Sequence, residues 1–340
     1  MKIIDLAEYD YTIDDNLFYS IRYLDVLREE YNFTFKIIID DDAKGNNPLL
    51  VFAEIDDIFG KRIISLPFCD YTEPLTKSDC DTLLILEFLK KTHPDFPITI
   101  KLHGKMDEAE DLGYKNVRNA VCHRVDLRSD IEGLWNNTNH AFRRGVNKAK
   151  KNGLRCEVNN TEDGIKIFHR LLTILRMKKF GILPQPITFY MCFLKHFINK
   201  GYGNVWFSYL NDKPIASVIV LNSGKGIYYK MGVSDTDYLD VRPNNLLFWE
   251  VMKHGNQMGF EFLDLGLSQL DYVGLIRFKD SLGGIQTSIN YYQYIPSDYN
   301  IKHEQEIRKL LKNLTGLFLR PQMSIETIEE AGRILYKYFC

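Results

Sequence analysis

A cluster of cations in the segment FRRGVNKAKKNG is the first feature whose residue types suggest chemistry. Arg144, Lys148 and Lys151 follow one another at i, i+4 and i+7, which places them on one stripe of a helix, with Arg143 and Lys150 beside it. Five cations in nine residues with no acid make a local positive surface. This surface suits phosphate contacts, either along a nucleic-acid backbone or with a nucleotide diphosphate, and a solvated helix face is the alternative.

Polar side chains also follow apolar runs at two predicted strand ends. Asp264, in FLDLG, lies where a carboxylate can accept a proton from an amine or orient a lysine, or can cap the following turn. In SLPFCDYTEPL of the first half, Asp70 and Tyr71 occupy a similar place. Tyr229, in GIYYKMGVS, either faces substrate or is an ordinary tyrosine of a half-buried strand. The histidines show no ligand spacing, so no metal site is predicted; they include His103, His123, His140 and His254.

The composition describes the kind of chain that must position these residues. Its 340 residues, 45% apolar and 13% aromatic, predict two packed domains. A net charge of -2 gives no global basic field, so no DNA partner is expected. The six cysteines form no CxxC pair, which predicts reduced thiols rather than disulfides or a zinc site. No run approaches the roughly 18 apolar residues of a membrane-spanning helix, so we expect a soluble, cytoplasmic protein.

The order of predicted elements repeats along the chain. In the first half, strands in PLLVFAEID and KRIISLPFCDY precede a helix in CDTLLILEFLKKTHP and a strand in FPITIKLHG. In the second half, KPIASVIVLN, GKGIYYKMGVS, NNLLFWEVMKHGNQMG and FEFLDLG follow in the same order. The offsets are 245 − 82 = 163, 261 − 98 = 163 and 227 − 63 = 164. A nearly constant offset indicates two copies of one unit, although any α/β protein alternates strands and helices.

Helical segments connect and follow the two copies. Helices are predicted from 134 to 152, from 161 to 180, from 187 to 200, and in the carboxy-terminal stretch. We therefore predict a first domain over residues 1–133, completed by carboxy-terminal helices in 297–340. The second domain is predicted over residues 134–296.

Four strings together resemble the FemAB/FemX-like branch of the acetyltransferase (GNAT) superfamily: SLPFCDYTEPL, HAFRRGVNKAKKNGLRCEV, VRPNNLLFWEVMKHGNQMGFEFLDLG and GLIRFKDSLGG. The resemblance implies an α/β (α+β) protein of two tandem GNAT-like acyl-CoA N-acyltransferase domains, with mixed sheets flanked by helices. It also implies transfer of an activated acyl group to an amine. Known members take an amino acid from aminoacyl-tRNA and attach it to peptidoglycan precursors, and related members are thought to use acyl-CoA or acyl carriers in polysaccharide or lipid-linked pathways. Since no segment has sustained heptads, the chain is more similar to the branch without a coiled-coil arm.

The same resemblance assigns roles within GLIRFKDSLGG. Lys279 occupies the place of a family lysine that can stabilise negative charge on the ester or thioester carbonyl during attack, and an exposed lysine near a glycine turn is the alternative. Phe278 is expected to pack the wall of the site. In the first domain, Asp70 and Tyr71 are expected to contact the acceptor, an amine-bearing precursor of cell-wall type.

The loop before each predicted crossover helix bears on the acyl donor. Superfamily enzymes that use acetyl-CoA hold its pyrophosphate with a glycine-rich turn, whereas DTDYLDVRPNNLL and EPLTKSDCDTLL contain no glycine. Arg242, with Pro243 at a helix start, still suits one anionic group. We therefore expect no tightly bound cofactor and aminoacyl-tRNA as co-substrate, with acyl-CoA as the alternative. A non-catalytic binding protein that kept the fold is the hypothesis of a different class.

Overall fold

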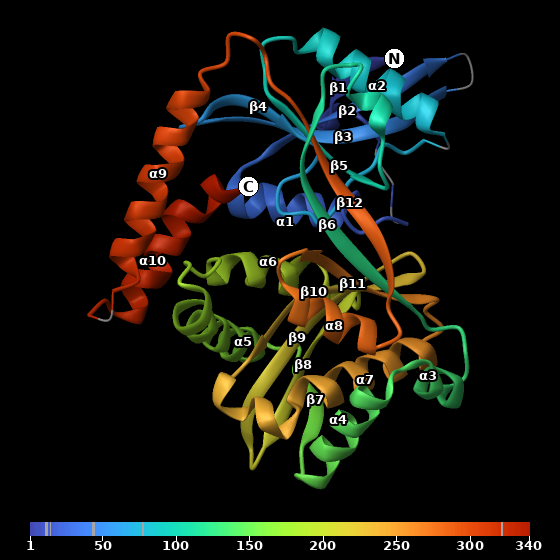
Figure 1. Ribbon diagram of the computed structural model, residues 1–340, viewed down its shortest axis with the longest axis vertical. Helices are drawn as coiled ribbons and strands as arrows, with labels where there is room; N and C mark the ends of the chain where they lie inside the picture. The colour runs from blue at the N-terminus through green and yellow to red at the C-terminus, as the bar shows by residue number, and fades with distance from the viewer. Residues whose placement is uncertain (11–12, 14, 43–44, 77, 321) are drawn as a thin grey trace. The chain divides into compact units, whose positions relative to one another are not determined.

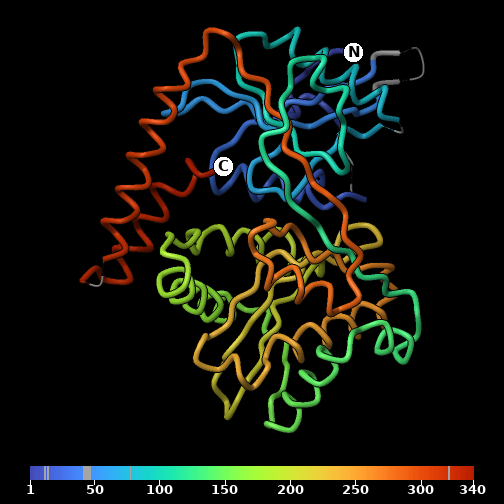
Figure 2. The backbone as a smooth tube through the Cα atoms, viewed as in Figure 1, coloured from blue at the N-terminus to red at the C-terminus, as the bar shows by residue number. Residues whose placement is uncertain are grey.

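The chain divides into two compact units. The computed structural model describes residues 1–340 except 11, 12, 14, 43, 44, 77 and 321, and of residues 41, 42, 45 and 46 it describes the backbone only (Figure 2). Unit 1 contains Met1–Val121, Thr287–Leu311 and Cys340, and unit 2 contains Cys122–Gln286 and Lys312–Phe339. Each unit is built around its own strands and helices, which Figure 1 labels.

Unit 1 is an antiparallel meander followed by a parallel crossover. Its strands pair in the order β1-β2-β3-β4-β5-β12-β6, and only the β4–β5 pair among those with a described register is parallel. The elements are β1 (Lys2–Asp5), α1 (Ile21–Tyr31), β2 (Thr34–Asp42), β3 (Gly45–Asp57), β4 (Gly60–Ile64), α2 (Asp79–Thr92), β5 (Ile98–His103), β6 (Lys115–Asp126) and β12 (Ile285–Tyr294). Helix α2 makes the crossover from β4 to β5.

Unit 2 repeats this plan with strands in the order β6-β11-β10-β9-β8-β7. Its elements are α3 (Ile131–Asn137), α4 (His140–Lys151), β7 (Arg155–Val158), α5 (Glu162–Leu175), α6 (Ile187–His196), β8 (Gly203–Leu210), β9 (Lys213–Ser223), β10 (Gly226–Ser234), α7 (Pro243–Gln257), β11 (Phe262–Gln269) and α8 (Val273–Ser281). Helix α7 makes the crossover from β10 to β11, which are parallel. Helices α5 and α7 pack on opposite faces of this sheet (Figure 1).

The predicted duplication is confirmed by the equivalent strands. Ile63 lies on β4 and pairs with Ile98 of β5, while Ile227 lies on β10 and pairs with Leu263 of β11. The spacing is 98 − 63 = 35 in unit 1 and 263 − 227 = 36 in unit 2. The structural equivalent of Ile98 is therefore Leu263, two positions beyond the Glu261 that the constant offset indicates.

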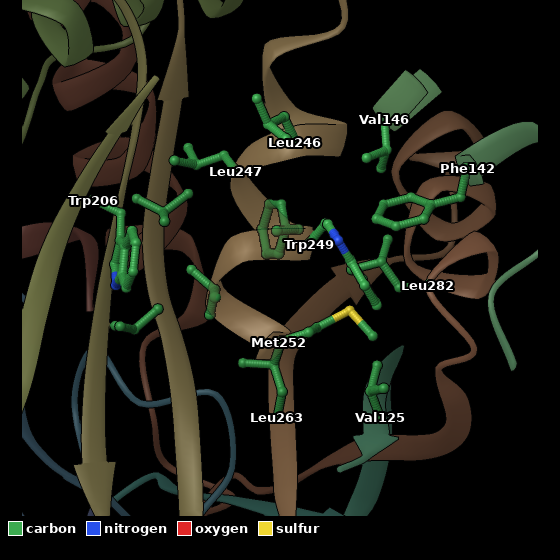
Figure 3. Close-up of a cluster of buried hydrophobic side chains, with 14 of the residues drawn as sticks. Val125, Phe142, Val146, Trp206, Leu246, Leu247, Trp249, Met252, Leu263 and Leu282 are labelled. Carbon is green, nitrogen blue, oxygen red and sulfur yellow. The ribbon is translucent and has the colours of Figure 1, made fainter. Parts of the chain in front are cut away.

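The core of unit 2 fills the space between the sheet and helices α4 and α7. Figure 3 shows side chains from the two helices and from β8 and β11 meeting in one cluster, with Trp249 of α7 near its centre. Trp206, Leu247, Met252 and Leu263 are all buried there. Burial of this apolar face holds α4 and α7 together and fixes α7 on the sheet.

Short polar side chains begin most of the helices. In six helices the residue before the first turn accepts a hydrogen bond from the backbone N–H three positions later: Ser20, Ser78, Asp130, Asn139, Thr161 and Ser324. This cap satisfies one of the amides that a helix start leaves without an internal partner. Asn139 also separates α3 from α4, where a single helix from 134 to 152 was expected. Among the described residues, no helix combines the length and apolar character needed to cross a bilayer.

Most of the carboxy-terminal helical segment belongs to unit 2, whereas the prediction assigned it to the first domain. Helix α9 (Ile301–Phe318) passes from unit 1 into unit 2, and α10 (Ile325–Leu335) belongs to unit 2. Ile328 and Ala331 of α10 pack on Leu183, in the GILPQP segment between α5 and α6. The first boundary also differs, because it falls within β6 at residues 121 and 122 rather than at 133 and 134. A long strand shared by both units places that boundary inside a regular element.

Candidate active site

Lys279 is a buried cation in unit 2. It lies in the last turn of α8 with 2% of its surface exposed. Its Nζ donates hydrogen bonds to the carbonyl oxygens of Gly266, at 2.8 Å, and Leu267, at 3.2 Å. The alternative of an exposed lysine near a glycine turn is therefore wrong. An ammonium group in such surroundings interacts strongly with any negative charge that forms beside it.

Asp264 lies inside β11, not at its end as the sequence indicated. The strand continues to Gln269, and Asp264 is 2% exposed. Its Oδ1 accepts a hydrogen bond from the N–H of Gly266 at 2.8 Å, and its Oδ2 lies 3.4 Å from Nη2 of Arg124. Gly266 has a φ of +67°, a left-handed conformation that favours glycine. Asp264 and Lys279 thus bind the two ends of the same glycine residue.

A buried histidine and a carboxylate lie next to Lys279, and neither was predicted. The side chain of His123, on β6, is wholly buried, and its Nε2 lies 3.1 Å from Oδ1 of Asp280. Burial, and then the charge of Lys279, lower the pKa of His123, against the opposing effect of Asp280. His123 and Asp280 are far apart in sequence and share no motif spacing, so no sequence signal could have paired them.

Tyr229 and Phe278 form an aromatic wall. The ring of Tyr229 packs edge-on against that of Phe248, with centroids 5.0 Å apart. The ring of Phe278 also packs against Phe248, with centroids 5.5 Å apart. The ring centroid of Phe278 also lies 6.4 Å from that of Phe142 of α4, a member of the core cluster of Figure 3, and Phe278 packs against this cluster. The expectation that Phe278 packs the wall agrees with this arrangement, and the contact of Tyr229 with Phe248 supports the packing alternative for Tyr229.

The cationic helix separates into one structural arginine and an exposed face. Nη1 of Arg143 donates to the carbonyl oxygens of Trp135, Asn136 and Thr138, around the carboxyl end of α3. Arg144, Lys148 and Lys151 are exposed on α4, and among the described residues they have no carboxylate partner. We refer to these three side chains as the α4 cationic face.

Arg242 stands at the start of α7. The preceding residues Thr236–Val241 form a short 3-10 helix, and Arg242 itself is exposed with a left-handed φ of 64°. The side chain of Arg242, the residue before the first turn of α7, makes no capping hydrogen bond. The same turn packs closely on α4, because a Cβ on Gly145 would lie only 2.4 Å from Nδ2 of Asn245. The start of α7 therefore offers backbone N–H groups beside one exposed guanidinium.

Asp70 and Tyr71 belong to unit 1 and follow β4, which ends earlier than expected, at Ile64. Asp70 is half-buried, whereas Tyr71 is buried against Phe18 and His103. A buried lysine, Lys101, stabilises the loop that carries them, because its Nζ donates a hydrogen bond to the carbonyl oxygen of Cys69 at 2.6 Å. Burial lowers the pKa of Lys101.

The structure thus brings together some of the predicted residues. Lys279 and Asp264 meet at Gly266, Tyr229 and Phe278 meet at Phe248, and the α4 cationic face forms a separate surface. All of these lie in unit 2.

Comparison with known proteins agrees with this architecture. The acetyltransferase (GNAT) domain family matches residues 136–273. The structure of FemX has a TM-score of 0.63 and 15% sequence identity, over 91% of this chain and 99% of FemX. A conserved protein of unknown function from Bacteroides thetaiotaomicron has a TM-score of 0.55 and 13% identity, over 84% of this chain and 94% of that protein. A comparison with curated protein sequences gives no significant match.

These similarities bear out the expected resemblance and the expected fold class. Residues 136–273, which include the crossover helix α7 and the strand that carries Asp264, form a GNAT acetyltransferase-type domain. The chain therefore contains an acetyltransferase-type (GNAT) domain and shares its fold with FemX.

Proposed function

We propose that the chain is an aminoacyltransferase that moves an activated aminoacyl group from aminoacyl-tRNA to an amine of a cell-wall-precursor-like acceptor. The observation that carries this proposal is the buried ammonium group of Lys279, held against β11 in the GNAT-type domain. The shared fold with FemX and the resemblance of its motifs to the FemAB/FemX family support the choice of donor and acceptor.

The proposed chemistry is attack of a neutral amine on the ester carbonyl of the donor. A C–N bond forms, the carbonyl oxygen becomes negative, and the C–O bond to the tRNA ribose then breaks. The amine loses a proton, and the departing ribose oxygen gains one. Lys279 stabilises the negative oxygen through its charge, which is effective because the side chain is shielded from water.

We assign Asp264 to orienting Lys279 rather than to accepting the proton. Its Oδ1 holds the N–H of Gly266, and the carbonyl oxygen of Gly266 accepts from Lys279. The carboxylate of Asp264 is 2% exposed, and its Oδ2 lies 3.4 Å from Nη2 of Arg124, so both of its oxygens already have partners within the protein.

The α4 cationic face is proposed to contact the phosphates of the tRNA. Arg144, Lys148 and Lys151 are exposed and have no carboxylate partner among the described residues, so their charges are available to a polyanion. Arg143 is left out of this role, because its guanidinium binds three backbone carbonyl groups.

Acceptor binding is proposed for Asp70 and Tyr71 of unit 1. The half-buried carboxylate of Asp70 suits an ammonium or hydroxyl group of the acceptor. The ring of Tyr71 packs on Phe18 and His103, which fixes the loop that presents Asp70.

The start of α7 favours a second candidate, an acyl-CoA- or acyl-carrier-dependent N-acyltransferase. The side chain of Arg242 does not cap the first amides of this 15-residue helix, and Arg242 is exposed beside them. Such a helix start can bind a phosphate group. The preceding loop, Thr236–Val241, disfavours binding of a pyrophosphate, because it has no glycine and carries the carboxylates of Asp237 and Asp240.

A donor screen tests the proposal. The protein is incubated with individual aminoacyl-tRNAs or with short-chain acyl-CoAs, together with a UDP-linked muropeptide, and products are identified by mass spectrometry. We expect an increase of one aminoacyl residue from a charged tRNA and no transfer from acyl-CoA. Transfer from acyl-CoA, with stoichiometric CoA binding in calorimetry, would instead establish the second candidate.

A further inference from the structure

His123 is a polar side chain at the centre of unit 2 whose burial needs an explanation. None of its side-chain surface is exposed. Its Nε2 is bound to the carboxylate of Asp280, and its Nδ1 is buried without a hydrogen-bond partner among the described residues. Because a carboxylate only accepts hydrogen bonds, the proton of the neutral ring lies on Nε2 and the lone pair on Nδ1. A buried nitrogen without a partner costs free energy, so packing alone would favour an apolar residue here.

His123 is connected to Lys279 through Asp280, the next residue of α8. Asp280 follows Lys279 on α8, and the two side chains bind different strands. Lys279 binds carbonyl groups of β11, and Asp280 binds His123 of β6 and, at 2.7 Å, Nε2 of Gln286. The last turn of α8 is therefore bound to three strands, β11 through Lys279 and β6 and β12 through Asp280.

Gly284 packs against both the side chain of His123 and the backbone of Lys279. A Cβ on Gly284 would lie 2.8 Å from the carbonyl oxygen of Lys279 and 3.2 Å from Cβ of His123. Only a glycine lets the chain after α8 approach both groups this closely. Removal of the imidazole would leave a cavity directly beside the backbone that carries Lys279.

Burial of the ring, together with the nearby charge of Lys279, disfavours its protonated form. The groups that face it are the ammonium of Lys279 and the carboxylate of Asp280, both on α8, with the uncharged amide of Gln286 beyond Asp280. Burial and the ammonium group disfavour an imidazolium more strongly than the carboxylate favours it, which lowers the pKa of His123. A neutral ring adds no positive charge that would repel Lys279.

We infer that His123 is a positioning residue for Lys279: through Asp280 and Gly284 its neutral ring holds the last turn of α8 so that the ammonium group stays on the carbonyl groups of Gly266 and Leu267. This inference rests on the proposed function, in which Lys279 is the catalytic cation. His123 itself is buried and does not contact substrate.

Four variants of the full chain test this role. His123→Ala removes the ring. Asp280→Ala removes the carboxylate that binds the ring, and because the Asp280 side chain is 40% exposed, this change opens no cavity. His123→Gln keeps an N–H group close to Asp280 but cannot become charged. His169→Ala is the matched control, since His169 is equally buried and its ring contacts a carbonyl oxygen of Gln185 and a carboxylate of Glu329.

The first measurement is the ammonium signal of Lys279 in nitrogen-15 NMR, identified by its absence in Lys279→Met. We expect hydrogen exchange of this signal to become at least tenfold faster in His123→Ala and Asp280→Ala, and to stay within about threefold of wild type in His123→Gln and His169→Ala. No substrate is needed, so this readout separates the positioning role from the proposed function. A folded Asp280→Ala protein with an unchanged Lys279 signal would overturn the inference, even if His123→Ala fails to fold.

The second measurement is turnover with the donor and acceptor found in the screen. We expect kcat to fall tenfold or more in His123→Ala while KM changes less than about threefold, and His123→Gln to restore most of kcat. A stable His123→Ala protein with wild-type kcat and an unchanged Lys279 signal would contradict the role. Absence of turnover with every pair would count against the proposed function alone.

Discussion

The ammonium nitrogen of Lys279 lies 2.8 Å from the carbonyl oxygen of Gly266, a residue with a φ of +67° in the middle of β11. The left-handed conformation turns this peptide unit away from the regular ladder, where its carbonyl group can accept from a side chain of α8. Asp264 binds the N–H of the same glycine. The position of the proposed catalytic cation therefore depends on a backbone conformation that favours glycine.

Replacement of Gly266 by Ala tests this dependence. A Cβ in the left-handed region costs about 1–2 kcal/mol, so we expect the unfolding free energy in urea to fall by that amount. Turnover should fall as well, because relaxation of the strain moves the carbonyl group that holds Lys279. Gly201→Ala is the control: Gly201 has a φ of +80° and open space at its Cβ position. The dependence is wrong if both variants lose stability equally and turn over substrate equally well.

Arg143 and Arg144 are neighbours with different predicted effects on stability. Arg143 donates to three backbone carbonyl groups near the end of α3, whereas Arg144 is exposed. We expect Arg143→Ala to lower the unfolding free energy by about 1–3 kcal/mol, because it leaves these acceptors without their charged donor. Arg144→Ala should leave the urea midpoint almost unchanged. Equal midpoints for the two variants would show that the contacts of Arg143 contribute nothing.

Binding of tRNA should depend on salt through the α4 cationic face. Each phosphate neutralised by a protein cation contributes about 0.7–0.9 to the slope of log affinity against log salt. The triple variant with Gln at positions 144, 148 and 151 should therefore reduce this slope by about 2–3 and weaken binding of all tRNAs alike. Filter binding between low and moderate salt measures it. An unchanged slope would assign the face to solvent, the alternative that the sequence left open.

His254 should make the stability of unit 2 depend on pH. Its ring lies edge-on to Trp206, with centroids 5.4 Å apart, and burial lowers its pKa below the usual value near 6.5. As the pH falls, the unfolded chain takes up the proton before the folded chain does, so stability is lost below about pH 6.5. His254→Gln should reduce this loss between about pH 7.5 and 5.5. An NMR titration midpoint of His254 at or above its usual value would refute the prediction.

The sequence predicted the fold further than it predicted the site. Both crossover helices, α2 and α7, follow from apolar periodicity, and the repeated order of elements follows from the constant offset. The offset misplaced the equivalent of Ile98 by two positions, because pattern matching does not define the register of paired strands. The helix start at Asn139 was missed because the apolar stripe continues across the break between α3 and α4.

The contacts of the site depend on tertiary structure that one sequence does not contain. Asp264 was placed at a strand end because it follows an apolar run, yet β11 continues through Gly266 to Gln269. The cationic stripe on α4 was visible, but the binding of Arg143 to the end of α3 depends on how the two helices meet. The ring of His123 on β6 meets Asp280 of α8 only in the folded chain, and no spacing rule connects the two residues.

Replacement of Lys279 by Met tests the central proposal most directly. Met keeps most of the length and the apolar stem but removes the charge that would stabilise the developing oxyanion. With the donor and acceptor from the screen, we expect kcat to fall about a hundredfold or more, with little change in substrate affinity. Lys90→Met is the control, because Lys90 also donates from a partly buried Nζ to a backbone carbonyl group, that of Leu112 in unit 1, and its turnover should match wild type. A folded Lys279→Met protein with wild-type kcat would contradict the assignment of Lys279 as the catalytic cation.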